Sequence, residues 1–346
     1  MTPPLRPELA GLTVYRRDEA LHRWDFSDNT NLFGSAPSAL AAMSSWAGRS
    51  PSRYPTAGTD RLRVALAEWL GVAADQIVAG CGSNDMLDAA MRAFGAPGSR
   101  MAYAAPTFVM ASHFAAANSL DVVAVPTPAG GEPDVAALIA TGARVIYLAT
   151  PNNPSGRAAS PGTVQELLDR APGIVILDEA YTEYLGSTWA AVAAGRDNVV
   201  VTRTFSKAWG LAGLRIGYAV GAVRLVDEMA KARGPYKVNA VAEQAAAAAV
   251  EEDQAWLAAV VEQTRKARPA LSASLRQLGY AVLPSDANFV SVQVSDARRT
   301  AAALEARGIA VRAMVAVPGL GDLLRITVGP EPAMAALVAA MAEVSR

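Results

Sequence analysis

The chain has 346 residues, of which 52% are hydrophobic, so it can bury a large core and we expect one large domain and one smaller one. Its 31 Lys and Arg residues nearly balance its 32 Asp and Glu residues, which gives a net charge of -1. This balance leaves no positive excess to recruit nucleic acid or anionic lipid, and it therefore favours small-molecule chemistry.

The sequence predicts a cytoplasmic protein. Residues 1–4 lack the basic region and the apolar core of a signal peptide. Apolar stretches such as residues 245–250 are interrupted by charge well before they reach the roughly 20 residues that span a bilayer.

The few cysteine and histidine residues point away from a metal site. The single cysteine, Cys81, cannot form an internal disulfide, and its apolar surroundings predict a buried, inert thiol. The two histidines, His22 and His113, are not spaced as metal ligands, so we expect no metal.

Seven short apolar runs rich in Val and Ile recur between about residues 77 and 221, with stretches of helical character between them. They are Ile77–Ala79, Met101–Ala104, Val122–Val125, Val145–Ala149, Ile174–Leu177, Val199–Thr202 and Ile216–Val220. Continuous apolar strands that alternate with helices predict a mostly parallel seven-stranded sheet covered by helices, which is an α/β domain.

The last third of the chain has a different pattern. Residues 239–278 are Ala-rich and helical, and the pattern then predicts elements at 288–294 (strand), 297–307 (helix), 309–312 (strand), 323–328 (strand) and 332–344 (helix). This order predicts a smaller α+β domain. We therefore expect an N-terminal arm over residues 1–36, a large domain over 37–240 and a small C-terminal domain over 241–346.

The most informative segment, residues 204–218, follows a predicted strand. It brings Lys207 near the carboxyl edge of the sheet, where α/β proteins bind ligands. A lysine is nucleophilic only when unprotonated, and the glycines and apolar residues around Lys207 favour that state by desolvation. Ser206 offers a hydroxyl and Arg215 a rigid fork of donors, both suited to a phosphate. The alternative is a solvated lysine beside a turn serine and a surface arginine.

Two upstream strands end in polar residues that suit an aromatic cofactor. Asp178 ends a buried strand, where an unpaired carboxylate is costly and a protonated ring nitrogen is one possible partner. Tyr181, three residues later, and Asn153, in the turn after the preceding strand, could donate to a phenolate oxygen of such a ring. A structural ion pair or a helix cap is the alternative for Asp178.

Residues 80–85 connect a strand to a helix, and backbone amides at a helix N-terminus bind phosphate. The dinucleotide pattern G-x-G-x-x-G fails here, because Asp85 stands at the third glycine position, and no G-K-[ST] follows. A single phosphate fits better than a nicotinamide dinucleotide, which argues against a dehydrogenase.

The ordered set Asn153, Asp178, Tyr181, Ser206, Lys207 and Arg215 resembles the class I/II, fold-type I aminotransferases. The stretches 52–55, 285–289 and 324–329 are similar to the histidinol-phosphate aminotransferase branch of that family. The resemblance covers about residues 25–329. It implies pyridoxal 5′-phosphate as cofactor, held as a Schiff base on Lys207, and a homodimer whose active sites lie at the subunit interface.

The resemblance also implies roles for residues that would otherwise be unremarkable. Ser83 and Asn84 match the donors to the cofactor phosphate, Phe108 matches an aromatic residue that stacks on the ring, and Tyr54 matches a tyrosine that reaches the partner subunit's phosphate. For the substrate, the resemblance implies Arg325 for the acid group, Arg312 for a phosphate, and Tyr15 and Asn31 for the pocket and its lid.

The chain departs from the family pattern mainly around the substrate. Residues 28–34 differ from the usual asparagine motif, Tyr15 lacks the usual context of the tyrosine lid, and Lys237 stands where a neutral residue is common. We therefore expect transamination between an amino acid donor and a keto acid or aldehyde acceptor, most like histidinol-phosphate transamination. The alternatives are an aromatic or other biosynthetic aminotransferase, a decarboxylase of the threonine-phosphate type, and a catalytically silent relative.

Overall fold

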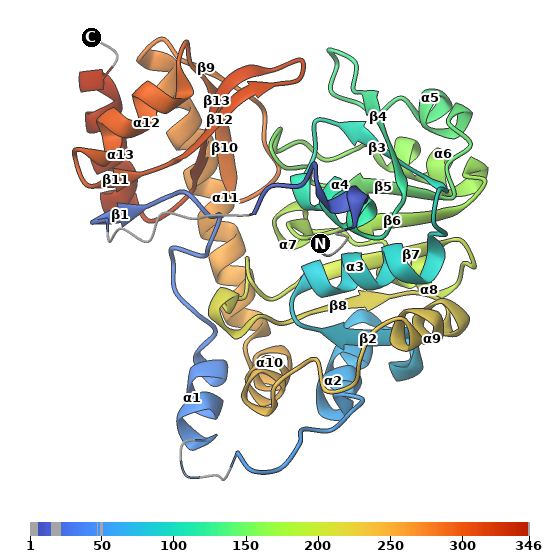
Figure 1. The fold of residues 1–346 in the computed structure, drawn as a ribbon. Helices are drawn as coiled ribbons and strands as arrows, with labels where there is room; N and C mark the ends of the chain where they lie inside the picture. The colour runs from blue at the N-terminus through green and yellow to red at the C-terminus, as the bar shows by residue number, and fades with distance from the viewer. Residues whose placement is uncertain (1–5, 15–21, 47, 49–50, 345–346) are drawn as a thin grey trace, which may run out of the picture.

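The computed structural model describes residues 6–14, 22–46, 48 and 51–344. Its centre is a seven-stranded sheet in the order β2-β8-β7-β6-β5-β3-β4 (Figure 1). The strands are β2 (Ile77–Gly80), β3 (Arg100–Ala105), β4 (Asp121–Pro126), β5 (Val145–Ala149), β6 (Ile174–Asp178), β7 (Val199–Thr204) and β8 (Gly217–Val220). Strand β8 runs antiparallel to both of its neighbours and the other pairs are parallel. The predicted mostly parallel seven-stranded sheet is confirmed.

Helices cover both faces of this sheet because each central strand is apolar on both sides. Along β5, Tyr147 and Ala149 join one core, whereas Ile146 and Leu148 join the opposite one. The first core is closed by α3 (Ser83–Phe94), α4 (Val109–Ala117) and α9 (Val223–Lys231). The second is closed by α5 (Val135–Ala140), α6 (Pro161–Arg170) and α8 (Ala190–Ala194).

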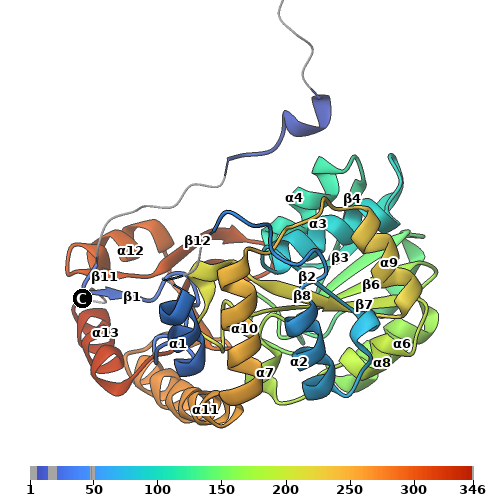
Figure 2. The same ribbon diagram turned by 90° about the horizontal axis from the view of Figure 1, so that it is seen from below.

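A third helical group packs beside β2 and β8, as Figure 2 shows. It consists of α1 (Pro37–Trp46), α2 (Asp60–Leu70) and α10 (Ala240–Glu252). Helix α10 is buried along most of its length and contacts both α1 and α2. Its run of alanines allows this close approach, since small side chains let helix backbones come together.

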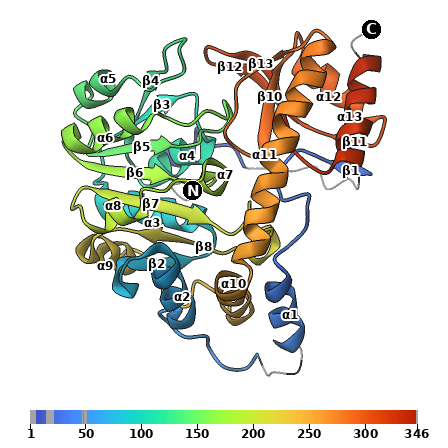
Figure 3. The ribbon, with the colours of Figure 1, turned by 180° about the vertical axis from the view of Figure 1, so that it is seen from behind.

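The second sheet has four antiparallel strands in the order β12-β13-β10-β9. Its strands are β9 (Ala281–Val282), β10 (Phe289–Gln293), β12 (Arg312–Val317) and β13 (Gly321–Thr327). The helices α11 (Gln254–Gln277), α12 (Ala297–Glu305) and α13 (Glu331–Val344) enclose its core. Figure 3 shows α11 running from this sheet down to α10. The predicted α+β character is confirmed.

The segment predicted as one strand over 309–312 is divided between two sheets. Strand β11 (Ile309–Ala310) pairs in parallel with β1 (Trp24–Asp25), and β12 begins at Arg312. The N-terminal segment is therefore joined to the C-terminal part of the chain. The predicted limits of the arm and of the two domains stay a prediction.

The remaining described elements are short: η1 (Pro7–Leu9), η2 (Ala74–Gln76), α7 (Thr182–Leu185) and η3 (Ala212–Leu214). Among the described residues, none of the helices combines the length and the apolar character needed to cross a bilayer. The same residues contain no group of three or more His, Cys, Asp or Glu side chains placed to share a metal ion.

Candidate active site

Lys207 lies three residues after the end of β7, at the carboxyl edge of the central sheet. Its Nζ donates a hydrogen bond to the backbone oxygen of Asp28, 2.7 Å away. Burial, helped by the nearby charge of Arg325, lowers the pKa of Lys207 from 10.5 to about 7. A substantial fraction of this side chain is therefore a free amine at neutral pH, which is the state that attacks an aldehyde.

Asp178 is the last residue of β6 and lies between β5 and β7, in register with Ala149 and Thr202. Its carboxylate is buried and accepts a hydrogen bond from Tyr147 Oη at 2.7 Å, through Oδ2, and from the Ala180 amide at 3.2 Å, through Oδ1. Burial raises the pKa of Asp178, and the two hydrogen bonds act in the opposite direction. The site thus holds one buried carboxylate close to the lysine.

Tyr181 and Asn153 both approach this group from the loops that follow β6 and β5. The Tyr181 hydroxyl accepts a hydrogen bond from Asn29 Nδ2 at 3.0 Å, and Lys207 Nζ lies 6.0 Å from the centre of the Tyr181 ring. Asn153 accepts through Oδ1 from Arg325 Nη1 at 2.9 Å. With this oxygen engaged, the amide nitrogen is the part of Asn153 that can act as a donor in the site.

Ser206 and Arg215 meet the N-terminus of α3. Arg215 Nη1 donates to Ser206 Oγ at 3.3 Å, and a Cβ atom on Gly82 would lie 2.6 Å from Arg215 Nη2. A Cβ atom on Gly217 would lie 2.4 Å from the Ser83 amide nitrogen. The two glycines thus let a guanidinium, a hydroxyl and the first amide of a helix converge, which is a donor set that binds a phosphate.

Asn84 and Phe108 lie at the starts of two neighbouring helices. Asn84 is the second residue of α3, and Phe108 precedes α4 and packs against the core beneath that helix. Both are partly buried. They follow β2 and β3, which both run in the same direction as β6, so they lie at the carboxyl edge of the sheet that also carries Asp178.

Arg325 and Arg312 face each other across β13 and β12. Arg325 Nη2 donates to the Ser27 backbone oxygen at 2.6 Å, and Arg312 Nη2 pairs with Asp28 Oδ1 at 2.6 Å. Both guanidinium charges lower the pKa of Lys207. The fold therefore brings two arginines from the far end of the chain to the lysine, as expected of groups that bind an anionic substrate.

The structure does not bring every predicted residue to this centre. The Tyr54 side chain is 82% exposed and stacks on Tyr236, with ring centroids 4.7 Å apart. Asn31 donates through Nδ2 to the Ala208 backbone oxygen at 2.8 Å, so it fixes the segment that carries Lys207. Tyr15 lies outside the described residues. Their predicted roles stay predictions.

Two residues of the N-terminal segment and one of β5 were missed as site residues. Asp28 and Asn29 contact Lys207 and Tyr181, and Tyr147 contacts Asp178. Asn29 has a φ of 53°, which is the left-handed conformation that Asn tolerates better than most residues. Two asparagines and an aspartate within residues 28–31 were the available signal for this turn.

The prediction of a buried Cys81 is wrong, because the side chain is exposed. The apolar run that precedes it forms β2, but Cys81 lies in the turn after that strand, where its backbone amide donates to Asp85 Oδ2 at 3.1 Å. Asp85 also lies 3.7 Å from Lys237 Nζ, so the charge at Lys237 has an acidic neighbour on α3.

The sequence model of the family described as aminotransferase class I and II matches residues 23–341. The chain belongs to this family. The predicted membership of the fold-type I aminotransferases, and with it the predicted enzyme class, is confirmed. The lysine, the buried carboxylate and the hydrogen-bond donors suited to a phosphate therefore lie in an aminotransferase fold.

Individual relatives agree with this assignment. The histidinol-phosphate aminotransferase of Roseiflexus castenholzii is 38% identical over 330 residues, covering 92% of this chain and 88% of the relative. A solved histidinol-phosphate aminotransferase from Sinorhizobium meliloti, in complex with pyridoxal 5′-phosphate, superposes with a TM-score of 0.89 at 28% identity, covering 99% and 97% of the two chains. The L-threonine-O-3-phosphate decarboxylase of Porphyromonas gingivalis superposes with a TM-score of 0.81 at 25% identity, covering 92% and 98%.

Proposed function

We propose that this aminotransferase holds pyridoxal 5′-phosphate on Lys207 and transfers an amino group between an amino acid and the keto counterpart of histidinol phosphate. The observation that carries the proposal is the partly buried side chain of Lys207, whose Nζ bonds to the Asp28 backbone oxygen and whose pKa is lowered to about 7. It lies in a site that also contains a buried carboxylate and a cluster of hydrogen-bond donors that can bind a phosphate. The names of the relatives support the choice of substrate.

The donor set fits this cofactor at three points. Asp178 supplies the anion that a protonated ring nitrogen needs, and Asn153 and Tyr181 supply polar groups for the ring oxygen. Ser206 and Arg215 supply donors for the phosphate, and Gly82 and Gly217 allow them to lie close to the N-terminus of α3. Ser83 and Asn84, at the start of that helix, are proposed to complete the phosphate site. Phe108 is proposed to cover the ring.

When bound, the pyridoxal ring stabilises negative charge that develops at the substrate Cα. Lys207 would act first as the base that removes the proton from the substrate Cα and then as the acid that returns a proton. A group with a pKa near 7 suits both roles at neutral pH. Asp178 would hold the ring nitrogen and favour its protonated form.

Two arginines are proposed to bind the substrate. Arg325, already fixed by Asn153 and Ser27, offers its fork to the carboxylate of the amino donor. Arg312, which pairs with Asp28 here, is proposed to exchange that partner for the phosphate of the acceptor. Tyr15 and Asn31 are proposed to line the same pocket.

The proposal is tested on purified protein supplied with pyridoxal phosphate. We expect a visible absorption band that is lost on addition of histidinol phosphate and restored by a 2-oxo acid. We expect Lys207→Ala to lack the band and to lose at least about a hundredfold in turnover. Wild-type turnover by Lys207→Ala, or a protein that ignores added pyridoxal phosphate, would contradict the proposal.

A decarboxylase is the second candidate, because the threonine-phosphate decarboxylase shares the fold over most of the chain. The two candidates differ in product. Release of carbon dioxide from threonine phosphate, without formation of a keto acid, would favour the decarboxylase. A keto acid formed in amounts equal to the amino product favours transamination. Faster turnover of amino donors with aromatic side chains than of histidinol phosphate would favour an aromatic aminotransferase.

A homodimer with shared active sites is proposed from the exposed Tyr54–Tyr236 stack. A mixture of Lys207→Ala and Tyr54→Phe chains tests it. If Tyr54 serves the partner subunit's site, mixed dimers contain one site with both wild-type residues, and phosphate affinity returns in that site. A cytoplasmic location without nucleic-acid or membrane partners stays a prediction.

A further inference from the structure

Tyr147 lies in the interior of the central sheet and is fully buried. It is in register with Ile176 of β6 and with Tyr103 of β3. Because side chains alternate along a strand, Tyr147 shares a face of the sheet with Asp178, two residues beyond Ile176. The length of the tyrosine side chain spans this offset, so its phenol meets the carboxylate at the end of the neighbouring strand.

In the hydrogen bond between Tyr147 and Asp178, the tyrosine is the donor. Burial raises the pKa of Tyr147 well above 10, so the phenol keeps its proton and donates to Asp178 Oδ2 at 2.7 Å. The Ala180 amide engages the other carboxylate oxygen at 3.2 Å. A donated hydrogen bond favours the ionised carboxylate, and the Tyr147 bond accordingly lowers the pKa of Asp178 against the effect of burial.

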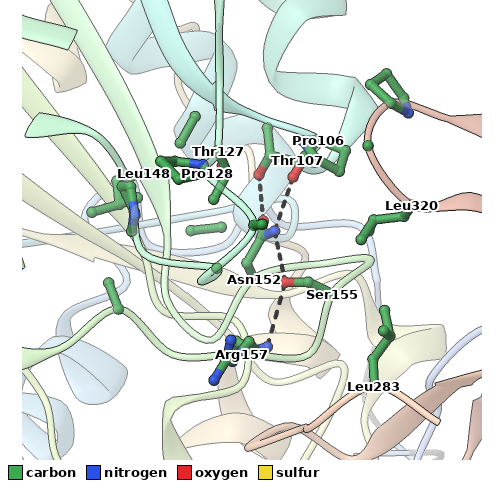
Figure 4. A pocket seen from close by; sticks show the side chains of 18 of the residues that line it. Pro106, Thr107, Thr127, Pro128, Leu148, Asn152, Ser155, Arg157, Leu283 and Leu320 are labelled. Carbon is green, nitrogen blue, oxygen red and sulfur yellow. Dashed lines mark hydrogen bonds between the residues drawn. The ribbon is translucent and has the colours of Figure 1, made fainter. Parts of the chain in front are cut away.

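The loops that follow β3 and β5 are joined by a polar network close to the carboxyl ends of these strands. Thr107 Oγ1 donates to Asn152 Oδ1 at 2.6 Å. Asn152 Nδ2 in turn donates to the Pro106 backbone oxygen at 2.9 Å and to Ser155 Oγ at 3.1 Å (Figure 4). These residues line a cavity of about 290 Å³. Tyr147 itself is fixed by its burial within β5 and by its hydrogen bond to Asp178.

We propose that Tyr147 is a positioning residue that keeps the Asp178 carboxylate ionised and oriented toward the ring nitrogen of the cofactor. This inference rests on the proposed function. The proton shared by the carboxylate and the ring nitrogen can reside on either group, and only the nitrogen-bound form gives the ring its full capacity to accept charge. Without the phenol, the desolvated carboxylate binds that proton more readily and the nitrogen loses it.

The test uses full-length Tyr147→Phe protein reconstituted with pyridoxal phosphate labelled with ¹⁵N in the ring. We expect the ¹⁵N chemical shift to move toward that of an unprotonated pyridine, and the dissociation constant of the cofactor to rise about tenfold. Tyr103→Phe is the matched control, because it removes a hydroxyl from the adjacent position of the same sheet. A wild-type ¹⁵N shift and a wild-type dissociation constant in Tyr147→Phe would overturn the inference.

A second variant keeps the test independent of folding. Site-specific 3-fluorotyrosine at position 147 nearly preserves the volume and makes the phenol a stronger donor, so we expect the nitrogen to stay protonated and the affinity to be equal or higher. Loss of the nitrogen proton in this variant would overturn the inference. Failure of the wild type and of Tyr103→Phe to bind the cofactor would instead overturn the proposed function.

Discussion

The side chain of Lys207 donates a hydrogen bond to the backbone carbonyl of Asp28 over 2.7 Å, so a residue near the start of the chain directly contacts the proposed nucleophile. The same Asp28 pairs through its carboxylate with Arg312. The environment of Lys207 therefore depends on segments that are almost 300 residues apart in the sequence.

The lowered pKa of Lys207 predicts how cofactor uptake depends on pH. The folded-state pKa of about 7 lies below the ordinary 10.5, so the free amine becomes dominant as the pH rises through 7. We expect the rate at which apoprotein takes up pyridoxal phosphate to rise from pH 5 to about 8 and then to level off. A rate that keeps rising to pH 10 would show an ordinary lysine.

Asp28→Asn changes this profile in a defined direction. The Asp28 charge raises the pKa of Lys207, and its removal also takes away the carboxylate that pairs with Arg312. We expect the midpoint of the uptake curve to move to lower pH. Asp25→Asn removes a carboxylate that bonds to Ser27 in the same segment, and it should leave the midpoint near 7. A shift in both variants, or in neither, contradicts a specific role of Asp28.

Gly82→Ala should disturb the phosphate cradle. Gly82 has a φ of 78°, and an added Cβ would lie 2.6 Å from Arg215 Nη2, so the guanidinium must move. Gly98→Ala is the matched control, since its φ is 75° but nothing lies within 4 Å of an added Cβ. We expect both variants to lose about 1 kcal/mol of unfolding free energy in denaturant titrations. Only Gly82→Ala should also bind pyridoxal phosphate at least about tenfold more weakly.

Arg312→Gln separates binding of the phosphorylated substrate from that of the amino donor. Loss of a charge-assisted contact to the phosphate should raise KM for the acceptor, the keto counterpart of histidinol phosphate, by about 10- to 100-fold. KM for the carboxylate donor, which is assigned to Arg325, should change much less. Arg307→Gln, which breaks an exposed ion pair with Glu343, should change neither constant. Equal increases for both substrates would contradict the division of roles between the two arginines.

The strands of the central sheet were predictable because parallel strands buried on both faces appear in the sequence as continuous apolar runs, such as those of β5 and β6. The small strands were not. Strand β1 has two residues, Trp24 and Asp25, and exists because β11 provides a partner, which no local pattern reveals. The prediction of a single strand over 309–312 was wrong for the same reason.

The predicted site residues that lie together were those tied to strand ends, such as Asp178 and Lys207, because parallel strands bring their carboxyl ends to one edge of the sheet. Tyr147 was missed since its position within a buried strand is also what an ordinary core tyrosine occupies. Its contact with Asp178 depends on the register between β5 and β6, and register is a tertiary property.

The pairing of β1 with β11 has a mechanical consequence. Trp24 and Phe26 donate backbone hydrogen bonds to Gly308 and Ala310, so the segment leading to Asp28 is fastened to the C-terminal part of the chain. The other end of this segment contacts Lys207, which follows strand β7 of the central sheet. A rotation of the C-terminal part would withdraw the Asp28 carbonyl and both arginines together. The pKa of Lys207 would therefore depend on the distance between the C-terminal part of the chain and the central sheet.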